Sequence, residues 1–268
     1  MTARFAATFE RLRAKGECGV FPYLTAGFPD VATSQALATA ALEAGADGFE
    51  IGVPFSDPLA DGATQQRANA RALDGGATLD TALDLVRFIR QQAPQAPVAL
   101  MSYYNPLRQR GDERVSLELA TAQADAVIVP DLPVEESATL RTALAAAGLG
   151  LVPMLAPTSR SARIAAVSAL EPVWIYCVAL VGVTGARQDI SAALGTFLSS
   201  VQTATSSPLI VGFGISQADH VRRAARFGAA GVIVASALTD LVEHAADPVA
   251  ATRDFVRELK QAAAAVPN

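Results

Sequence analysis

The sequence predicts an α/β protein that forms a single (β/α)8 barrel, or TIM barrel, with an extra helix at the N-terminus. Short apolar segments alternate with Ala-rich segments of helical periodicity, as in parallel strands joined by helices. The chain has 268 residues, a usual size for such a barrel. No linker or low-complexity stretch divides it, so residues 1–268 are predicted to form one domain.

Eight segments are predicted as strands because they are short and rich in Val, Ile and Leu, as strands covered on both faces are. They are residues 19–27, 48–55, 97–104, 126–133, 150–156, 173–180, 208–214 and 231–238. A similar phrase enters three of them: AGADGFEIG, AQADAVIVP and FGAAGVIVA. This recurrence is typical of a fold in which the chain turns repeatedly from a helix into the next strand.

Helical periodicity predicts helices over residues 33–44, 79–92, 135–147, 160–169, 190–202 and 216–227. Thr78, Ser159 and Ser216 are the expected N-caps, since a short side-chain oxygen accepts from the first free N–H groups. In the last helix Asp247 is the expected cap and Pro248 the first residue.

Composition argues against several classes of function. The net charge is −5 without a basic cluster, so neither a nucleic-acid partner nor a membrane surface is expected. Cys18 and Cys177 lie in apolar surroundings, as buried thiols in a reducing cytosol do. The N-terminus lacks a signal-peptide core, so we expect a cytoplasmic protein. His220 and His244 have no metal-like partner spacing, so no metal site is predicted.

Glu50 is the first candidate catalytic residue, because it lies inside an apolar strand. Alternation places Phe49 and Ile51 toward the helices and Glu50 toward the barrel axis. Burial there should raise the pKa of its carboxyl, which suits an acid that both gives and takes a proton. The alternative is an ion pair with an inward Arg or Lys. No predicted strand supplies one.

Asp61 is the second candidate, eleven positions later in the loop that carries Pro54 and Pro58. Such a loop can fold over the mouth of the barrel and bring Asp61 to a substrate. Asp61 could equally cap a helix over residues 64–73, and the sequence leaves both possibilities open. Asp57, within Ser-Asp-Pro, is better explained as a turn residue.

Small residues near the ends of late strands predict a phosphate site. In such barrels the loops after strands seven and eight bind phosphate with backbone N–H groups and a helix N-terminus. Gly214, Ala235 and Ser236 are the candidates. A longer Gly-containing loop with Thr184 is expected to act as a closing lid.

Aromatic residues near strand ends fit either core packing or a flat apolar pocket: Phe21, Tyr23, Tyr103, Tyr176 and Phe213. From these residues alone, a sugar-phosphate isomerase or epimerase is the first choice, since an inward acid beside a phosphate site suits it.

Several motifs together resemble the α subunit of tryptophan synthase, nearly end to end: FPYLTAGFPD, FEIGVPFSDPLADG, MSYYNP, VPDLPVEES, GVTGAR and GFGIS. The resemblance implies a cofactor-free lyase of tryptophan biosynthesis that cleaves indole-3-glycerol phosphate by a retro-aldol reaction, releasing indole and glyceraldehyde 3-phosphate. It also implies a β-subunit partner in an αββα heterotetramer.

The same resemblance assigns roles to individual residues. Glu50 and Asp61 correspond to the catalytic acids, and Thr184 to the lid residue that orients Asp61. The phosphate-binding positions correspond to Gly185, Gly214, Ala235 and Ser236, and Phe21, Tyr176 and Phe213 are expected to line the indole pocket. Loops carrying Pro54, Asp57 and Asn105 are expected to face the β subunit.

Three departures from the family pattern concern packing more than chemistry. Ala235 replaces a usual glycine, where a left-handed backbone would be strained. Residues 179–181 are more apolar than expected, and residues 107–125 lack the usual aromatic and Gly pattern. A second hypothesis, in another class, is a degenerate subunit that mainly activates its partner. The intact Glu50 and Asp61 argue against it, since a pure activator need not keep both acids.

Overall fold

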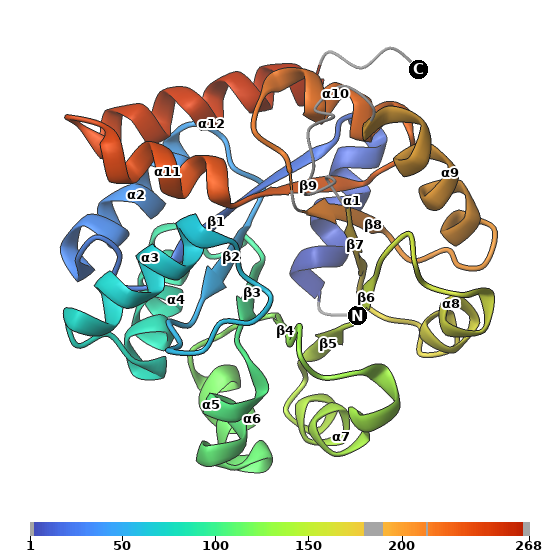
Figure 1. Ribbon diagram of the computed structural model, residues 1–268, viewed down its shortest axis with the longest axis horizontal. Helices are drawn as coiled ribbons and strands as arrows, with labels where there is room; N and C mark the ends of the chain where they lie inside the picture. Colours follow the sequence, from blue (N-terminus) through green and yellow to red (C-terminus); the bar gives the residue numbers. More distant parts are fainter. Residues whose placement is uncertain (1–2, 180–189, 213, 265–268) are drawn as a thin grey trace.

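The computed structural model describes residues 3–179, 190–212 and 214–264. Its strands are all parallel and form one nearly closed barrel surrounded by helices (Figure 1), which confirms the predicted TIM-barrel fold. They are β1 Gly19–Thr25, β2 Phe49–Gly52, β3 Val98–Met101, β4 Ala126–Ile128, β5 Gly150–Val152, β6 Met154–Leu155, β7 Ile175–Val178, β8 Leu209–Gly212 and β9 Gly231–Val234. The extent of the domain stays a prediction.

The structure has one strand more than expected because the fifth predicted strand is divided at Pro153. Its first part, β5, pairs with β4, and its second part, β6, pairs with β7. Proline has no N–H for a ladder, but the Pro153 carbonyl accepts from the Tyr176 N–H at 3.0 Å. The segment therefore joins the two edges of the sheet.

The helices are α1 Ala3–Lys15, α2 Val31–Glu43, α3 Ala63–Asp74, α4 Leu79–Gln92, α5 Tyr104–Arg110, α6 Asp112–Thr121, α7 Ala138–Ala146, α8 Ser161–Ser168, α9 Ile190–Gln202, α10 Ala218–Arg226, α11 Ser236–His244 and α12 Pro248–Ala264. Residues 134–136 form a single 3₁₀ turn before α7. Among the described helices, none combines the length and apolarity needed to cross a bilayer.

The ends of the helices agree with the sequence-based predictions at two N-caps and differ at two others. Thr78 caps α4 with a reciprocal capping box, and Asp247 accepts from two N–H groups of α12, as predicted. Ser159 and Ser216 are not N-caps, because the N-caps of α8 and α10 are Arg160 and Gln217. The last predicted strand, 231–238, is also too long, since α11 begins at Ser236.

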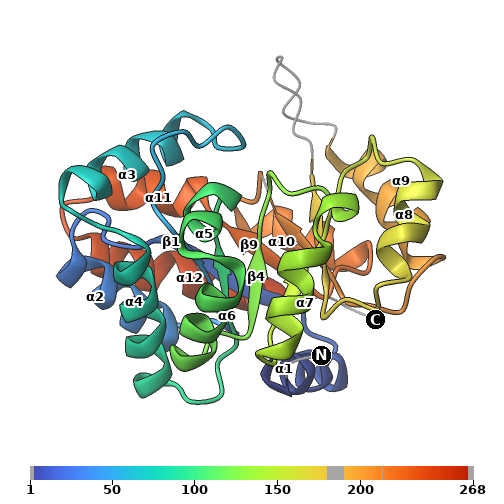
Figure 2. The ribbon, with the colours of Figure 1, turned by 90° about the horizontal axis from the view of Figure 1, so that it is seen from below.

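The barrel has two layers of core. Phe49, Ile51 and Val53 pack outward against the helices, as alternation predicts. Inside the barrel, α1 covers the N-terminal ends of the strands (Figure 2). There its Phe5 ring lies 6.2 Å from Phe21 and 5.9 Å from Trp174. Both cysteines are buried, as expected, and burial raises the pKa of each thiol to about 12.

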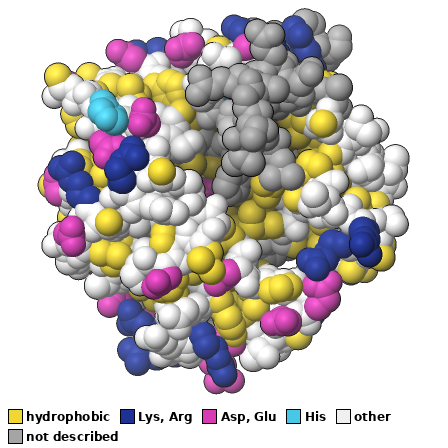
Figure 3. Space-filling model, in the orientation of Figure 1, with side chains coloured by type: hydrophobic (Ala, Val, Ile, Leu, Met, Phe, Trp, Pro, Cys, Tyr) yellow, Lys and Arg dark blue, Asp and Glu magenta, His cyan; other side chains and the backbone are white. Residues whose placement is uncertain are grey.

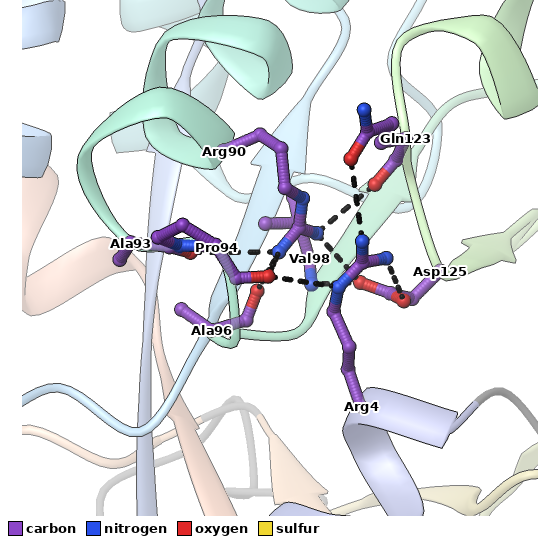
Figure 4. Close-up of polar contacts among 8 residues, drawn as sticks. All are labelled: Arg4, Arg90, Ala93, Pro94, Ala96, Val98, Gln123 and Asp125. Carbon is purple, nitrogen blue, oxygen red and sulfur yellow. Dashed lines mark hydrogen bonds and ion pairs between the residues drawn. The ribbon is translucent and has the colours of Figure 1, made fainter.

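Two buried aspartates hold α1 and the strand ends together. Asp125 accepts from Arg90 at 2.9 Å, from Arg4 of α1 at 3.0 Å and from the Val98 N–H at 2.9 Å (Figure 4). Asp47 occupies the matching place before β2, where it binds Arg11 at 2.7 Å and Lys260 at 2.6 Å. These are the aspartates of the recurring phrase, whose third copy has Ala230 instead.

Candidate active site

A cavity of about 150 Å³ lies at the C-terminal ends of the strands, opposite α1. Strand ends, the loop after β2, helix α3 and the start of α11 form its walls. The described residues that line it are Tyr23, Glu50, Asp61, Gly62, Gln65, Met101, Ile128, Pro130, Met154, Tyr176, Gly214, Ile215, Ala235 and Ser236. Both predicted acids and three predicted phosphate-site residues therefore meet at one small, largely apolar space.

Glu50 lies inside the barrel, where its side chain faces the cavity and is 4% exposed. Within the described part of the chain it has no ion-pair partner, and its Oε2 atom has no hydrogen-bond partner. Burial raises the pKa of its carboxyl to about 8, with a further contribution from nearby Asp61. The alternative of an inward Arg or Lys partner is not realised among these residues.

Asp61 approaches the cavity from the loop between β2 and α3. It does not cap α3, because the N-cap is Gly62; its Oδ2 atom instead accepts from Asn69 Nδ2 at 3.0 Å. Burial raises the pKa of Asp61 to about 6, while hydrogen bonding from Asn69 and Tyr103 opposes the rise. At neutral pH the pair therefore holds one protonated acid, Glu50, and one carboxylate, Asp61.

The phosphate corner combines a turn with the start of a helix. Gly214 has a φ of +82°, a conformation that favours glycine. Ser236 is the first residue of α11 and Ala235 its N-cap, so the free N–H groups of the first turn adjoin the cavity. Ala235 has a φ of −111°, and the strain expected from replacing glycine does not arise.

The aromatic wall differs from the prediction at one position. Tyr176 lines the cavity, but Phe21 does not, because it packs against α1 at the other end of the barrel. Tyr23 takes its place beside Glu50, with which it is paired in register. The two tyrosines need their neighbouring glycines: a Cβ at Gly52 or Gly212 would lie 1.9 or 2.0 Å from a tyrosine hydroxyl. Phe213, Thr184 and Gly185 lie outside the described residues.

The expected partner-facing residues lie at the same end of the barrel in different settings. Asp57 is exposed and bonded to Ser56, as a turn residue is. Pro54 is buried and offers no surface, and Asn105 is exposed but belongs to helix α5, not to a loop. Phe55 and Tyr103 connect the two segments, with ring centroids 5.3 Å apart.

Sequence reasoning missed two polar residues of α3, Gln65 and Asn69. Both are buried, and they lie one turn apart on the face that points to the site. The available signal was a pair of amides at a helical spacing of four on an otherwise apolar stripe. Met101 and Met154, which line the cavity, were also missed, because strand periodicity alone does not distinguish a cavity-lining side chain from one in the barrel core.

Two other features lie away from this chemistry. A wider cavity of about 640 Å³ separates α7 from α8, where apolar atoms and arginines share the surface (Figure 3). It meets the smaller cavity only through Pro130 and Met154 among their described lining residues. Asp240, Glu243 and His244 cluster on α11, but Arg67 already pairs with Glu243 at 2.7 Å. The absence of a metal or cofactor stays a prediction.

The fold and the site are those of a barrel enzyme, with two acids of raised pKa and the predicted phosphate-site residues around one largely apolar cavity. The sequence profile of one family, "Tryptophan synthase alpha chain", matches residues 9–266. The chain belongs to this tryptophan synthase alpha chain family.

Relatives support the assignment over the full chain. The tryptophan synthase alpha chain of Roseiflexus sp. (strain RS-1) is 50% identical over 260 residues, which cover 96% of this chain and 99% of the relative. That of Chloroflexus aggregans is 47% identical, with 97% of each chain covered. The solved tryptophan synthase subunit alpha from Legionella pneumophila str. Paris is 31% identical, with a TM-score of 0.88 and 98% of each chain covered.

A solved tryptophan synthase from Mycobacterium tuberculosis agrees, with a TM-score of 0.89, 31% identity and coverage of 98% of this chain and 99% of that chain. The protein is thus an enzyme of tryptophan biosynthesis that catalyses the lyase reaction of the alpha chain. Its family is known to work with a beta subunit.

Proposed function

We propose that the chain cleaves indole-3-glycerol phosphate to indole and glyceraldehyde 3-phosphate, with Glu50 as proton donor and acceptor and Asp61 as charge stabiliser. The observation that carries this proposal is the unlike state of two acids at one cavity. The pKa of Glu50 is about 8 and that of Asp61 about 6. Near neutral pH, Glu50 keeps a proton to give, while Asp61 carries a negative charge.

The reaction needs both states. Glu50 donates its proton to indole C3, which leaves a positive charge centred on the ring nitrogen. Asp61 accepts a hydrogen bond from the ring N–H and offsets that charge. The Glu50 carboxylate then removes the proton of the side-chain hydroxyl. The carbon–carbon bond breaks, its electrons return to the ring as indole forms, and the hydroxyl carbon becomes the aldehyde.

The phosphate end of the substrate is assigned to Gly214, Ala235 and Ser236. The first turn of α11 has unpaired N–H groups and the positive end of the helix dipole, which together favour an anion. Gly185 and Thr184 complete the proposed set from outside the described residues. Tyr23 and Tyr176 supply a flat apolar wall for the indole ring.

The proposed partner is a tryptophan synthase β subunit in an αββα heterotetramer. We place the contact on the rim that carries Asp57, Leu59 and Asn105. Leu59, in the loop between Asp57 and Asp61, is 90% exposed and so presents an apolar side chain that a partner could cover. This rim adjoins the Asp61 loop, so docking there would act on the position of Asp61 and raise turnover.

Indole release from indole-3-glycerol phosphate, measured across pH, tests the assignment. Because Asp61 must be ionised and Glu50 protonated, kcat/KM should rise through about pH 6 and fall through about pH 8. The phosphate of the substrate also titrates near pH 6, so the control is Asp61→Asn, in which the rise that belongs to Asp61 should disappear. Release of no indole, alone or with a β chain, would contradict the proposal.

A further inference from the structure

Asn69 contacts the Asp61 carboxylate from a buried position on α3. It is 2% exposed, and its Nδ2 atom donates to Asp61 Oδ2 at 3.0 Å. Its own Oδ1 atom has no hydrogen-bond partner among the described residues. A buried amide that leaves its oxygen unsatisfied is costly. The hydrogen bond that its Nδ2 atom donates therefore goes to a candidate catalytic acid.

The loop that carries Asp61 is held at other points through its backbone. The Ala60 N–H donates to the Tyr103 hydroxyl at 2.9 Å, and Gln66 Nε2 donates to the Asp61 carbonyl at 2.9 Å. These contacts fix the path of the loop. These backbone contacts do not involve the carboxylate itself, which is hydrogen-bonded by the Asn69 amide and by Tyr103.

We propose that Asn69 is a positioning residue of the reaction, whose amide holds the Asp61 carboxylate in the orientation that meets the ring nitrogen of the substrate. This inference rests on the proposed function of Asp61. Asn69 itself does not line the cavity, so it acts through Asp61 and not through the substrate.

The chemistry of the amide fits this role. An N–H donor stabilises the ionised form of a carboxyl group and so lowers its pKa, which is the direction in which Asn69 acts on Asp61. Without the Asn69 donor, burial would raise the pKa of Asp61 further, and a smaller fraction of Asp61 would be ionised at neutral pH. Asn69 should therefore influence both the orientation and the charge of Asp61.

Two substitutions test the inference through the pH dependence of indole release. Asn69→Ala removes the donor and should move the acidic limb of the kcat/KM profile upward by roughly one pH unit, with kcat at pH 7 lowered about tenfold. Asn69→Asp keeps the shape but places a second carboxyl against Asp61, where two negative charges repel. Its limb should move further upward. The alkaline limb, assigned to Glu50, should move little in either variant.

One neighbour on α3 provides a matched control. Arg67→Ala removes the exposed ion pair with Glu243. It is expected to keep the acidic limb within about 0.3 pH unit of the parent chain, because Arg67 does not touch the Asp61 carboxylate. A double variant, Asp61→Asn with Asn69→Ala, should lose no more rate than Asp61→Asn alone, since the two residues act as one unit.

The outcomes separate this inference from the proposed function. If Asp61→Asn abolishes turnover while Asn69→Ala keeps the parent profile, the positioning role is wrong and the function of Asp61 stands. If Asp61→Asn keeps turnover at saturating substrate, the proposed function fails first. Should Asn69→Ala not fold, as judged by its circular dichroism melt, the nearly isosteric Asn69→Asp still decides the question through its pH profile.

Discussion

Asp47 and Glu50 lie three residues apart, Asp47 before strand β2 and Glu50 within it, and their surroundings differ in kind. Both are buried, at 5% and 4% exposed. Asp47 accepts from Arg11, Lys260 and the Val20 N–H within 2.9 Å. Glu50 has no ion-pair partner among the described residues, and its pKa rises to about 8.

The comparison shows how the barrel divides its buried acids. At the N-terminal end, carboxylates are surrounded by cations and N–H groups, which keep them charged and bind α1 to the barrel. At the cavity, Glu50 has no such partners among the described residues, so under the proposed function a substrate completes its interactions. Buried acids would then serve stability at one end of the barrel and reaction at the other, a division that barrels of this class show.

The largest effect is expected from Glu50→Gln. A neutral amide cannot carry a proton, so indole release should fall roughly 10²–10⁴-fold while the fold is kept. The steady-state rate at saturating substrate measures the loss, and a far-UV spectrum checks the fold. A variant that keeps more than a third of the parent rate would place Glu50 with the structural acids.

Asp61→Asn should lower turnover by roughly 10²–10³-fold, since an amide oxygen still accepts from the ring N–H but cannot offset a full positive charge. Substrate binding should change much less. Separate measurement of kcat and KM decides the matter: a raised KM with kcat intact would show that Asp61 serves binding alone.

Asp125→Ala is the reciprocal experiment at the structural end. It leaves buried Arg90 without its charge partner, which should cost about 3 kcal/mol or more of the free energy of unfolding. The site is at the opposite end of the strands, so kcat of the folded enzyme should change less than about threefold. Urea unfolding and the indole assay measure the two sides. A large loss of kcat with little loss of stability would contradict the assignment of Asp125 to stability and of the cavity acids to the reaction.

A further effect concerns stability across pH. The carboxyl of Glu50 has a pKa of about 8 in the folded chain and an ordinary value of 4.5, so ionisation opposes folding as pH rises between these values. The parent chain should therefore lose stability over this range relative to Glu50→Gln. The difference in Tm between the two should grow by roughly 10 °C from pH 5 to pH 9. A constant difference would mean that Glu50 is not desolvated.

Much of this arrangement could be predicted from the sequence, because it depends on short-range periodicity. Alternation along residues 49–53 is enough to send Glu50 inward and its neighbours outward. The recurring sequence marks the starts of β2, β4 and β9, and its second residues, Gly45, Gln123 and Gly228, all have positive φ. The reaction itself was predicted from the family motifs, because the same motifs occur along this chain in the same order as in the family.

Only the tertiary structure decided where each of these residues stands along the barrel. Phe21 and Tyr23 both point inward, yet two residues of strand span roughly 6.6 Å, and that distance separates the α1 end from the cavity. Periodicity gives the face of a strand and not its height, which follows from the stagger of neighbouring strands. In the same way, Asp61 could be a helix cap or a catalytic acid until the loop path placed its carboxylate against Asn69 and left the cap to Gly62.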